Sequence, residues 1–178
     1  MRIAISGTHF SGKSTLVDAV SEALPKYTTV AEPYALLEEE GVLFADPPSL
    51  DDFEQQLERA IQELEESGTD VIFDRCPADI LGYILAHHDV DLFDPAQWLA
   101  RVRRAVQKLD LIVFLAIEEP DPIPLPVSQD AGYRKRVDEI LREILLDDPF
   151  GFEVEVLQAA GSAQIRADQV LAYVRKTL

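Results

Sequence analysis

Residues 2–20 read RIAISGTHFSGKSTLVDAV and contain, from Gly7 to Ser14, the pattern G-x-x-x-x-G-K-[ST]. The residues before the pattern form a short apolar strand, and those at 16–24 place apolar side chains on one face of a helix. A strand before this pattern and a helix after it are the context in which it binds phosphate. The stretch therefore predicts a strand, a phosphate-binding loop and a helix.

The chemistry of this loop follows from its residue types. Backbone N–H groups of a glycine-rich turn, together with the positive end of the following helix, favour anionic oxygens. Lys13 supplies a charge for terminal phosphates, and Ser14 supplies a hydroxyl for Mg²⁺. A glycine-containing turn that binds nothing is the alternative, and the Lys-Ser pair argues against it. The predicted nucleotide-binding residues are Gly7, Thr8, His9, Phe10, Ser11, Gly12, Lys13, Ser14 and Thr15.

The charge of the chain limits its partners. Its 178 residues include 33 acidic and 16 basic ones, which gives a formal net charge of −17. The field of such a protein repels nucleic acids and anionic membranes, so we predict neither as a partner. Nucleotide binding would require the few basic groups to gather locally, and Lys13 and Arg75 are candidates. The length suits one domain over residues 1–178.

Several features exclude other classes of protein. The single cysteine, Cys76, rules out an intrachain disulfide and is expected to be a small buried side chain. The adjacent His87 and His88 lack a spaced partner for a metal site and are expected to be exposed. No apolar run approaches transmembrane length and no signal peptide precedes the first strand, so we predict a soluble cytoplasmic protein. The chain has no asparagine, which excludes the N-K-x-D segment of guanine-reading GTPases.

Two predicted strands end in carboxylates. Residues 28–31 lead to Glu32, which the following proline keeps extended, and residues 70–74 end at Asp74, which precedes Arg75. In open parallel sheets, ligands bind at the carboxyl ends of the strands. Three apolar residues followed by an aspartate suit a carboxylate that holds Mg²⁺. The alternative is an Asp-Arg pair that only caps the next helix.

The rest of the chain alternates between helical and strand patterns. Ser49 and Asp94 are expected helix N-caps, the second in a capping box with Gln97. Alternating strands and helices predict an α/β protein with a parallel five-stranded sheet between two helical layers. The further predicted helices cover 50–64, 77–85, 95–109, 134–145 and 163–178, and the further strands cover 111–116 and 152–157.

Three segments each allow two interpretations. Asp79 and Tyr83 lie four residues apart on one helix face and contact either a ligand or each other. The alternating prolines at 120–126 form either a surface crossover or an arm that carries the next helix across the site. The basic residues 134–136 act either at the site or in a surface ion-pair network with acidic neighbours.

With these residues in view, the chain resembles the small P-loop kinases of the nucleoside and nucleotide kinase group, and within it the ribosylnicotinamide-kinase-like domains. Two departures from the group pattern are Phe10, where many nucleotide kinases have glycine, and DAGYR at 130–134, where the lid usually has an aspartate-glycine-arginine run. The resemblance spans nearly the whole chain and rests on GTHFSGKST, the Glu32-Pro33 strand end, VIFDRCPADILGY, QDAGYRKR and AAGSAQIR.

The resemblance implies a P-loop NTPase fold with sheet order 2-3-1-4-5 and a lid near residues 127–147. It places Ser14 and Asp74 around Mg²⁺, and the turn at 159–163 beside adenine. Glu32 would orient or deprotonate an acceptor hydroxyl. The catalytic residues that it implies are Lys13, Glu32, Asp74, Arg75, Arg134 and Arg136.

The leading functional hypothesis is ATP-dependent phosphotransfer to a hydroxyl of a small, nucleoside-like acceptor, with ATP and Mg²⁺ as cofactors. The alternative is a nucleotide-binding regulatory ATPase that acts on a partner protein. Glu32, Asp79 and Tyr83 are expected on the acceptor side with Arg75 as the one cation, which predicts an acceptor without a phosphate of its own. Whether the chain forms a homodimer stays open.

Overall fold

The computed structural model describes residues 1–177, in which five parallel strands form one sheet in the order β2-β3-β1-β4-β5. The central strand pairs on both sides, with Ile5 opposite Asp74 on one side and Val113 on the other. The strands are β1 (Arg2–Ser6), β2 (Thr28–Val30), β3 (Val71–Asp74), β4 (Leu111–Phe114) and β5 (Val156–Gln158). The predicted fold class and strand order are therefore confirmed.

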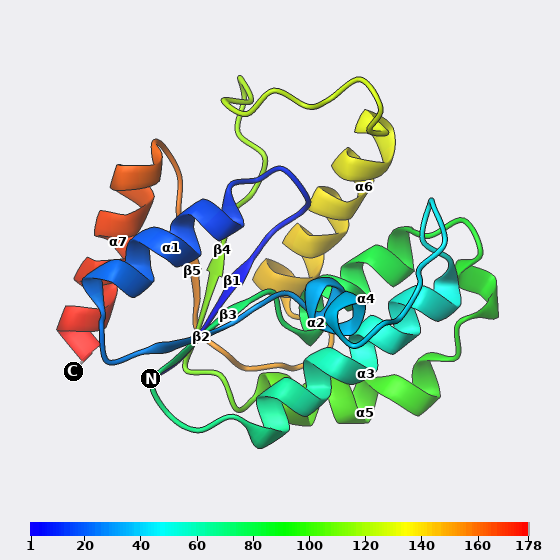
Figure 1. The fold of residues 1–178 in the computed structure, drawn as a ribbon, viewed down its shortest axis with the longest axis horizontal. Coiled ribbons are helices and arrows are strands. Elements are labelled where there is room, and N and C mark those ends of the chain that lie inside the picture. The colour runs from blue at the N-terminus through cyan, green and yellow to red at the C-terminus, as the bar shows by residue number, and fades with distance from the viewer. Residues whose placement is uncertain (178) are drawn as a thin grey trace.

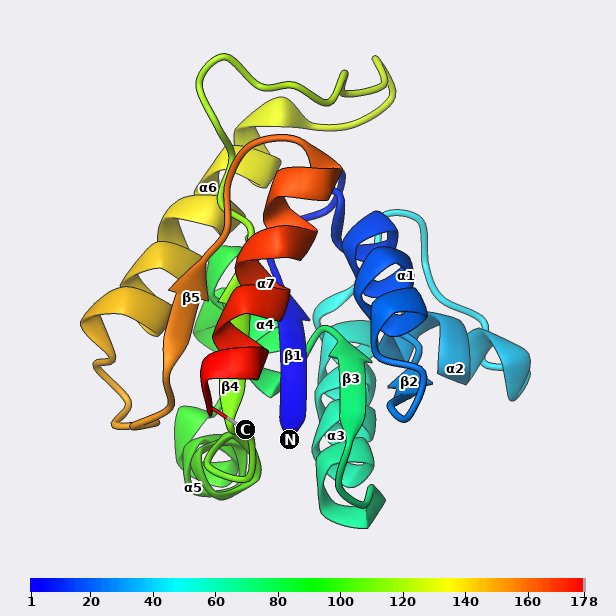
Figure 2. The same cartoon turned by 90° about the vertical axis from the view of Figure 1, so that its left-hand side faces the viewer.

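Helices cover both faces of this sheet and produce three layers (Figures 1 and 2). Side chains alternate along β1, so Ile3 and Ile5 pack against one helical layer while Ala4 packs against the other. No helix within the described part of the chain is long and apolar enough to cross a membrane. One layer contains α1 (Lys13–Ala23) and α7 (Ala163–Thr177), and the other contains α3 (Leu50–Glu66), α4 (Pro77–Ala86), α5 (Pro95–Val106) and α6 (Ala131–Arg142).

Local side chains start two of these helices as predicted. Ser49 caps α3, where its side chain accepts the Asp52 N–H and the Asp52 side chain accepts the Ser49 N–H. Asp94 caps α5 by accepting the Ala96 N–H at 3.0 Å. The Gln97 side chain donates to the Asp94 carboxylate at 3.0 Å, so it does not act as the predicted capping box requires.

The last strand begins four residues later than predicted, at Val156 instead of residue 152. The Asp148 carboxylate accepts the N–H groups of Phe152 at 2.7 Å and Glu153 at 2.9 Å, and Glu153 has a φ of 55°. A residue with this φ cannot continue an extended strand. Leu178, predicted on the apolar face of the last helix, lies outside the described residues.

His87 is buried, which corrects the prediction that it is exposed. It lies at the end of α4 with 5% of its surface exposed, and its ring meets Phe53 edge-on. Its Nδ1 accepts the Asp89 N–H at 3.1 Å, so this ring nitrogen has a hydrogen-bond partner within the fold. His88 is exposed, and Cys76 is buried, both as predicted.

The carboxyl edge of the sheet gathers the segments that carry the predicted site. The phosphate-binding loop follows β1, and the short helix α2 (Pro33–Glu39), which was not predicted, follows Glu32 at the end of β2. The proline-containing segment between β4 and α6 rises above the same edge in both views (Figures 1 and 2). Residues from these three crossover connections can therefore meet there.

Candidate functional site

The loop between β1 and α1 requires glycine at two positions. A Cβ at Gly7 would lie 2.6 Å from the carbonyl oxygen of Leu115, and Gly12, the N-cap of α1, has a φ of 88°. Phe10 also has a positive φ, 54°, which explains why glycine would suit this position. Such a conformation costs a non-glycine residue about 1 kcal/mol or more. The loop lies at the positive end of α1, where anionic oxygens are favoured.

Asp79 holds the start of this loop from the first turn of α4. Its carboxylate accepts the Ser6 hydroxyl at 2.6 Å and the N–H groups of Gly7 and Cys76, each at 2.9 Å. The side chain has no exposed surface. The prediction that Asp79 faces the acceptor is therefore wrong, because the residue is enclosed by the backbone that it supports.

Four basic side chains from different parts of the chain donate hydrogen bonds to the carbonyl oxygens of the loop. A peptide plane is rigid, so a carbonyl oxygen fixed outward turns the following N–H inward, towards an anion. The donors and acceptors are Arg75 to Gly7 O at 3.0 Å, Lys13 to Thr8 O at 2.8 Å, Arg134 to His9 O and Phe10 O at 3.0 Å each, and Arg166 to Ser11 O at 2.7 Å. Five successive carbonyl oxygens are thus bonded to cations.

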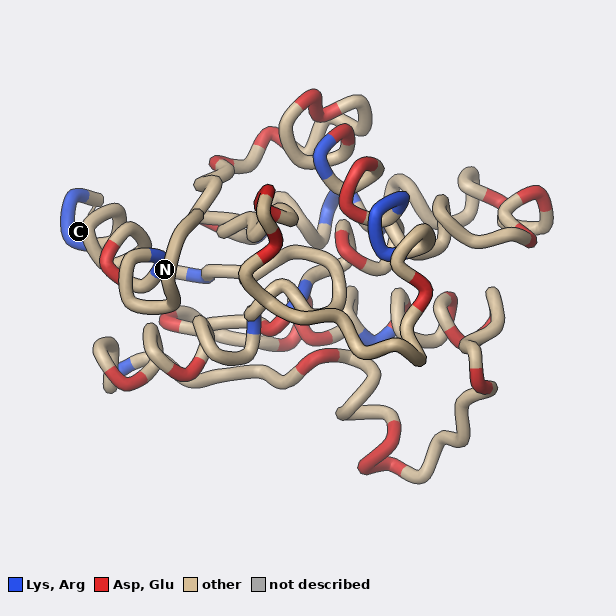
Figure 3. The backbone as a smooth tube through the Cα atoms, turned by 90° about the horizontal axis from the view of Figure 1, so that it is seen from above, with Lys and Arg blue, Asp and Glu red and all other residues tan. Residues whose placement is uncertain are grey.

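Each guanidinium of this group also pairs with a carboxylate. Glu32 pairs with Arg75, Asp121 with Arg134, and Glu118 with Arg166. Acidic residues are spread along most of the tube in Figure 3, so the gathering of cations around the loop is a local feature. Phosphate oxygens could compete with the three carboxylates for the same donors.

Lys13 is almost completely enclosed, with 6% of its surface exposed. Burial, followed by the nearby charge of Arg75, lowers the pKa of Lys13 to about 7. A phosphate bound beside the ammonium group would favour its charged form and raise this pKa again. An anionic ligand would thus supply a negative charge that stabilises the ammonium form of Lys13.

Ser14 and Asp74 form a pair of oxygens suited to Mg²⁺. The Ser14 hydroxyl donates to Asp74 Oδ2 at 2.8 Å. Asp74 Oδ1 is buried and has no hydrogen-bond partner among residues 1–177. Burial raises the pKa of Asp74 despite the opposing charge of Lys13, and a bound cation would satisfy the carboxylate. The two residues therefore fit the metal that the sequence predicts.

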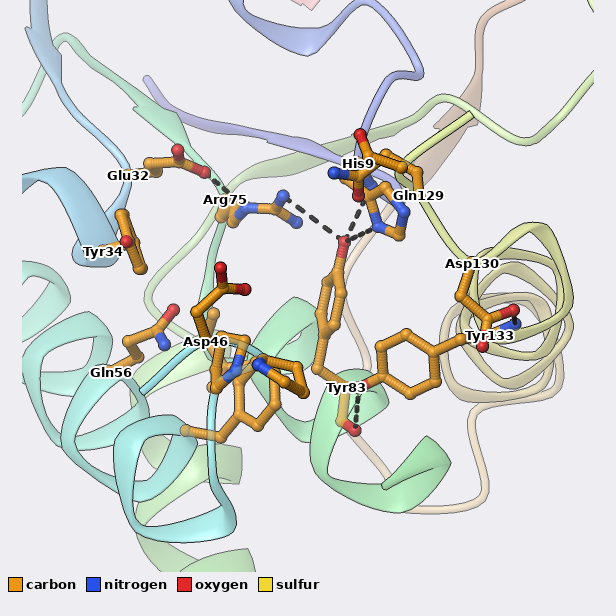
Figure 4. Close-up of a pocket in the computed structure, with 15 residues that line it drawn as sticks. His9, Glu32, Tyr34, Asp46, Gln56, Arg75, Tyr83, Gln129, Asp130 and Tyr133 are labelled. Carbon is orange, nitrogen blue, oxygen red and sulfur yellow. Dashed lines mark hydrogen bonds and ion pairs between the residues drawn. The ribbon is translucent and has the colours of Figure 1, made fainter. Parts of the chain in front are cut away.

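A cavity of about 530 Å³ adjoins the loop on the side of α3, α4 and α6 (Figure 4). Glu32, Arg75 and His9 line its upper part, and the aromatic rings of Tyr34, Phe53, Tyr83 and Tyr133 line its walls together with Gln56. The carboxylates that line it are Glu32, Asp46 and Asp130. Such a cavity can hold a small molecule with a planar or aliphatic part and several hydroxyl groups.

Glu32 and Arg75 form the polar end of this cavity. Arg75 Nε donates to Glu32 Oε2 at 2.8 Å. Burial alone would raise the pKa of Glu32, but the charge and hydrogen bond of Arg75 outweigh it, and the pKa is lowered. Glu32 is therefore an ionised acceptor for a hydroxyl, and a weak base.

Tyr83 connects the cavity with the phosphate-binding loop. Its hydroxyl oxygen accepts the His9 N–H at 2.7 Å, and its ring lies 5.1 Å from the Arg75 guanidinium carbon (Figure 4). The ring also stacks on Phe53 at a centroid distance of 5.6 Å. Of the predicted pair, Tyr83 therefore faces the cavity while Asp79 supports the loop.

The structure brings most of the predicted residues together, with one exception. Lys13, Asp74, Arg75 and Arg134 surround the loop, and Glu32 lies beside it. Arg136 instead donates to the carbonyl oxygen of Ala86 at 3.4 Å, on another side of α6. Ser14 and Thr15 are both exposed at the start of α1. Arg134 is 5% exposed and bonded to the loop, so it is not part of a surface ion-pair network.

Sequence reasoning assigned no role to several residues at the site. Arg166 lies in the quoted segment AAGSAQIR, but nothing in its spacing indicated a contact with Ser11. Gln56 sits on the apolar face of α3, where a buried amide in an otherwise apolar stripe is a usable signal. Tyr34 lies in α2, the helix after Glu32 that was not predicted, and for this reason its position in the cavity was not predicted either.

We expect His9 to make stability depend on pH below neutrality. Burial, followed by the charges of Arg75, Arg134 and Lys13, lowers the pKa of His9 from 6.5 to about 4. Between these values the unfolded chain binds a proton that the folded chain does not, so stability falls as pH falls through this window. Solvent screening at a partly exposed ring limits the loss to about 1–2 kcal/mol. Urea unfolding of His9→Gln should show a smaller loss than wild type, and equal losses would contradict the assignment.

The site and fold define a P-loop protein, and comparison with known proteins places it in a family. Residues 2–166 match the family described as AAA domain, and the chain therefore belongs to that family. No curated protein sequence matches the chain significantly.

Several solved structures have a similar fold. Deoxyadenosine kinase from M. mycoides with bound dATP has a TM-score of 0.65 and 16% identity, with 98% of this chain and 100% of that chain covered. Thymidylate kinase from Candida albicans has a TM-score of 0.61 and 18% identity, with 99% and 91% covered. Shikimate kinase from Aquifex aeolicus has a TM-score of 0.58 and 17% identity, with 99% and 98% covered. The chain thus has the fold of small P-loop kinases.

Proposed function

We propose that this protein transfers a phosphoryl group from Mg·ATP to a hydroxyl of a small, nucleoside-like acceptor. The observation that carries the proposal is the cavity of about 530 Å³ that adjoins the phosphate-binding loop and has the Glu32–Arg75 pair at its polar end. A module that only binds and hydrolyses nucleotide has no need of a second pocket at this position. The solved relatives named above, which act on different acceptors, support phosphotransfer as the reaction type.

The residues have separate roles in this proposal. The loop N–H groups and Lys13 bind the phosphates, and Arg75 and Arg134 offset charge on the transferring group. Ser14 and Asp74 hold Mg²⁺, which neutralises phosphate charge when bound. Glu32 accepts a hydrogen bond from the acceptor hydroxyl and orients its oxygen. Because phosphoryl transfer proceeds through a loose transition state, orientation matters more than a strong base.

The charge of the cavity favours an acceptor that is neutral or positively charged. Glu32, Asp46 and Asp130 line it, and Arg75 is its one guanidinium among the described residues. Arg75 is already bonded to Glu32 and to the Gly7 carbonyl oxygen. The resemblance to ribosylnicotinamide-kinase-like domains agrees with this charge, and nicotinamide riboside belongs among the acceptors to be tested.

We therefore expect nucleosides to be phosphorylated in preference to their monophosphates. A like-charge contact at about 4–6 Å costs on the order of a kcal/mol, which corresponds to roughly fivefold or more in kcat/KM. The measurement is initial-rate ADP formation with each nucleoside and its 5′-monophosphate at equal concentration. Faster phosphorylation of a monophosphate would overturn the assignment of acceptor charge.

Glu32→Gln should slow phosphoryl transfer roughly 10- to 100-fold while triphosphate affinity changes little. The amide still accepts a hydrogen bond but lacks the charge that orients the hydroxyl and pairs with Arg75. Glu22→Gln, on the exposed face of α1, is the matched control and should behave as wild type. If Glu32→Gln abolishes triphosphate binding and spares transfer, the residue belongs to the nucleotide side.

A further inference from the structure

Of the four basic residues that donate to the loop, Arg166 at the start of α7 has no role in the proposed reaction. It is 5% exposed. Its Nη1 donates to Ser11 O at 2.7 Å and its Nη2 to Glu118 Oε1 at 2.6 Å. Within residues 1–177, its Nε is buried without a hydrogen-bond partner. Burying a charged guanidinium with one unpaired N–H costs free energy of desolvation. This cost indicates a role for Arg166 beyond packing.

Glu118 fixes the position of this guanidinium. Besides Arg166, its Oε1 accepts the N–H of Gly161 at 2.9 Å. The side chain follows β4, whereas Gly161 lies in the turn before α7. One carboxylate therefore connects the segment after β4, the turn before α7 and the cation that contacts the loop.

The bond from Arg166 reaches the peptide whose N–H begins α1. The carbonyl oxygen of Ser11 and the N–H of Gly12 belong to one rigid plane, so holding the oxygen outward directs the N–H to the opposite side. Glycine at position 12 offers no steric resistance to rotation of this plane. A Cβ at Gly12 would lie 3.1 Å from Arg166 Nη1, which shows how closely the guanidinium approaches.

We propose that Arg166 is a positioning residue that holds the Ser11–Gly12 peptide with its N–H directed at the phosphates of the bound nucleotide, and that Glu118 holds Arg166 in place. The inference rests on the proposed nucleotide binding, and it concerns affinity for the phosphate chain rather than transfer to an acceptor. Arg166 acts through the loop backbone and requires no contact with the ligand.

The test is calorimetric titration of Arg166→Met with two probes, Mg²⁺ with a nonhydrolysable ATP analogue and Mg²⁺ with inorganic tripolyphosphate. We expect affinity to fall about tenfold or more for both probes, because the effect lies in the phosphate-binding peptide. Arg166→Lys should recover part of the loss. In turnover assays KM for ATP should rise more than kcat falls. Arg103→Met is the matched control, since Arg103 also donates to a backbone carbonyl, that of Phe150 at 2.7 Å, away from the loop.

Glu118→Gln provides a second route if Arg166→Met does not fold, and it should weaken both probes about threefold or more. Unchanged affinity in the folded variants, or a loss confined to the ATP analogue, would overturn the inference. If the wild-type protein binds both probes but phosphorylates no acceptor, the proposed function is contradicted. The role of Arg166 is then still decided by comparing the affinities of the variants. Wild-type protein that binds neither would contradict both.

Discussion

Lys13→Met should abolish most triphosphate binding and leave the fold intact. The ammonium group lies against the loop backbone, where it donates to Thr8 O at 2.8 Å, and a charge-assisted hydrogen bond is worth about 1.5–3 kcal/mol, or roughly 10- to 150-fold in affinity. Methionine has a similar length and carries no charge that burial would penalise. Because burial lowers the pKa of Lys13 to about 7, the neutral side chain should be accommodated without loss of stability.

Calorimetric titration with Mg²⁺ and an ATP analogue would measure this effect, and thermal unfolding of the same samples would report the fold. Lys108→Met, at an exposed lysine in the turn after α5, is the control for removing one positive charge from the chain. Wild-type affinity in Lys13→Met would contradict the phosphate-binding assignment of the loop.

Asp79→Asn should destabilise the protein by about 2–3 kcal/mol and also weaken triphosphate binding. Both carboxylate oxygens act as acceptors, one for the Gly7 N–H and the other for the Ser6 hydroxyl and the Cys76 N–H. An amide replaces one acceptor by a donor, so a buried backbone N–H would face an N–H group. The start of the loop would then have to move to relieve this contact.

Urea unfolding would measure the loss, with Asp94→Asn as the matched control. Asp94 is an exposed N-cap, and asparagine caps helices about as well as aspartate, so this variant should stay within about 0.5 kcal/mol of wild type. If Asp79→Asn is equally stable and binds triphosphate normally, Asp79 does not support the loop.

The parts of the site that the sequence predicted are those encoded by local patterns. The loop is one continuous segment, and Glu32 and Asp74 follow strands whose carboxyl ends must share an edge in a parallel sheet. The alternation of strands and helices indicated the layers, and the resemblance supplied the strand order. Apart from the strand order, each of these inferences needs only a short stretch of chain.

The parts that the sequence did not predict depend on contacts between distant residues. Arg166 and Ser11 are 155 positions apart, and Arg134 and His9 are 125 positions apart. Arg136 could have been rejected from helix geometry, because residues two apart on a helix point about 200° apart and cannot both face the loop. Asp79 was misplaced because its helix face contacts both the loop backbone and the cavity.

The most direct test of the proposed function is whether a small acceptor accelerates ADP formation from Mg·ATP. A panel of nucleosides, including nicotinamide riboside, should be screened by ³¹P NMR with wild-type protein and Glu32→Gln. We predict that at least one acceptor raises ADP formation well above the hydrolytic background, with one phosphomonoester formed per ADP, and that Glu32→Gln loses this gain. An ADP formation rate that stays the same with every acceptor, with inorganic phosphate as the one other product, would contradict phosphotransfer and indicate a nucleotide-hydrolysing regulatory module.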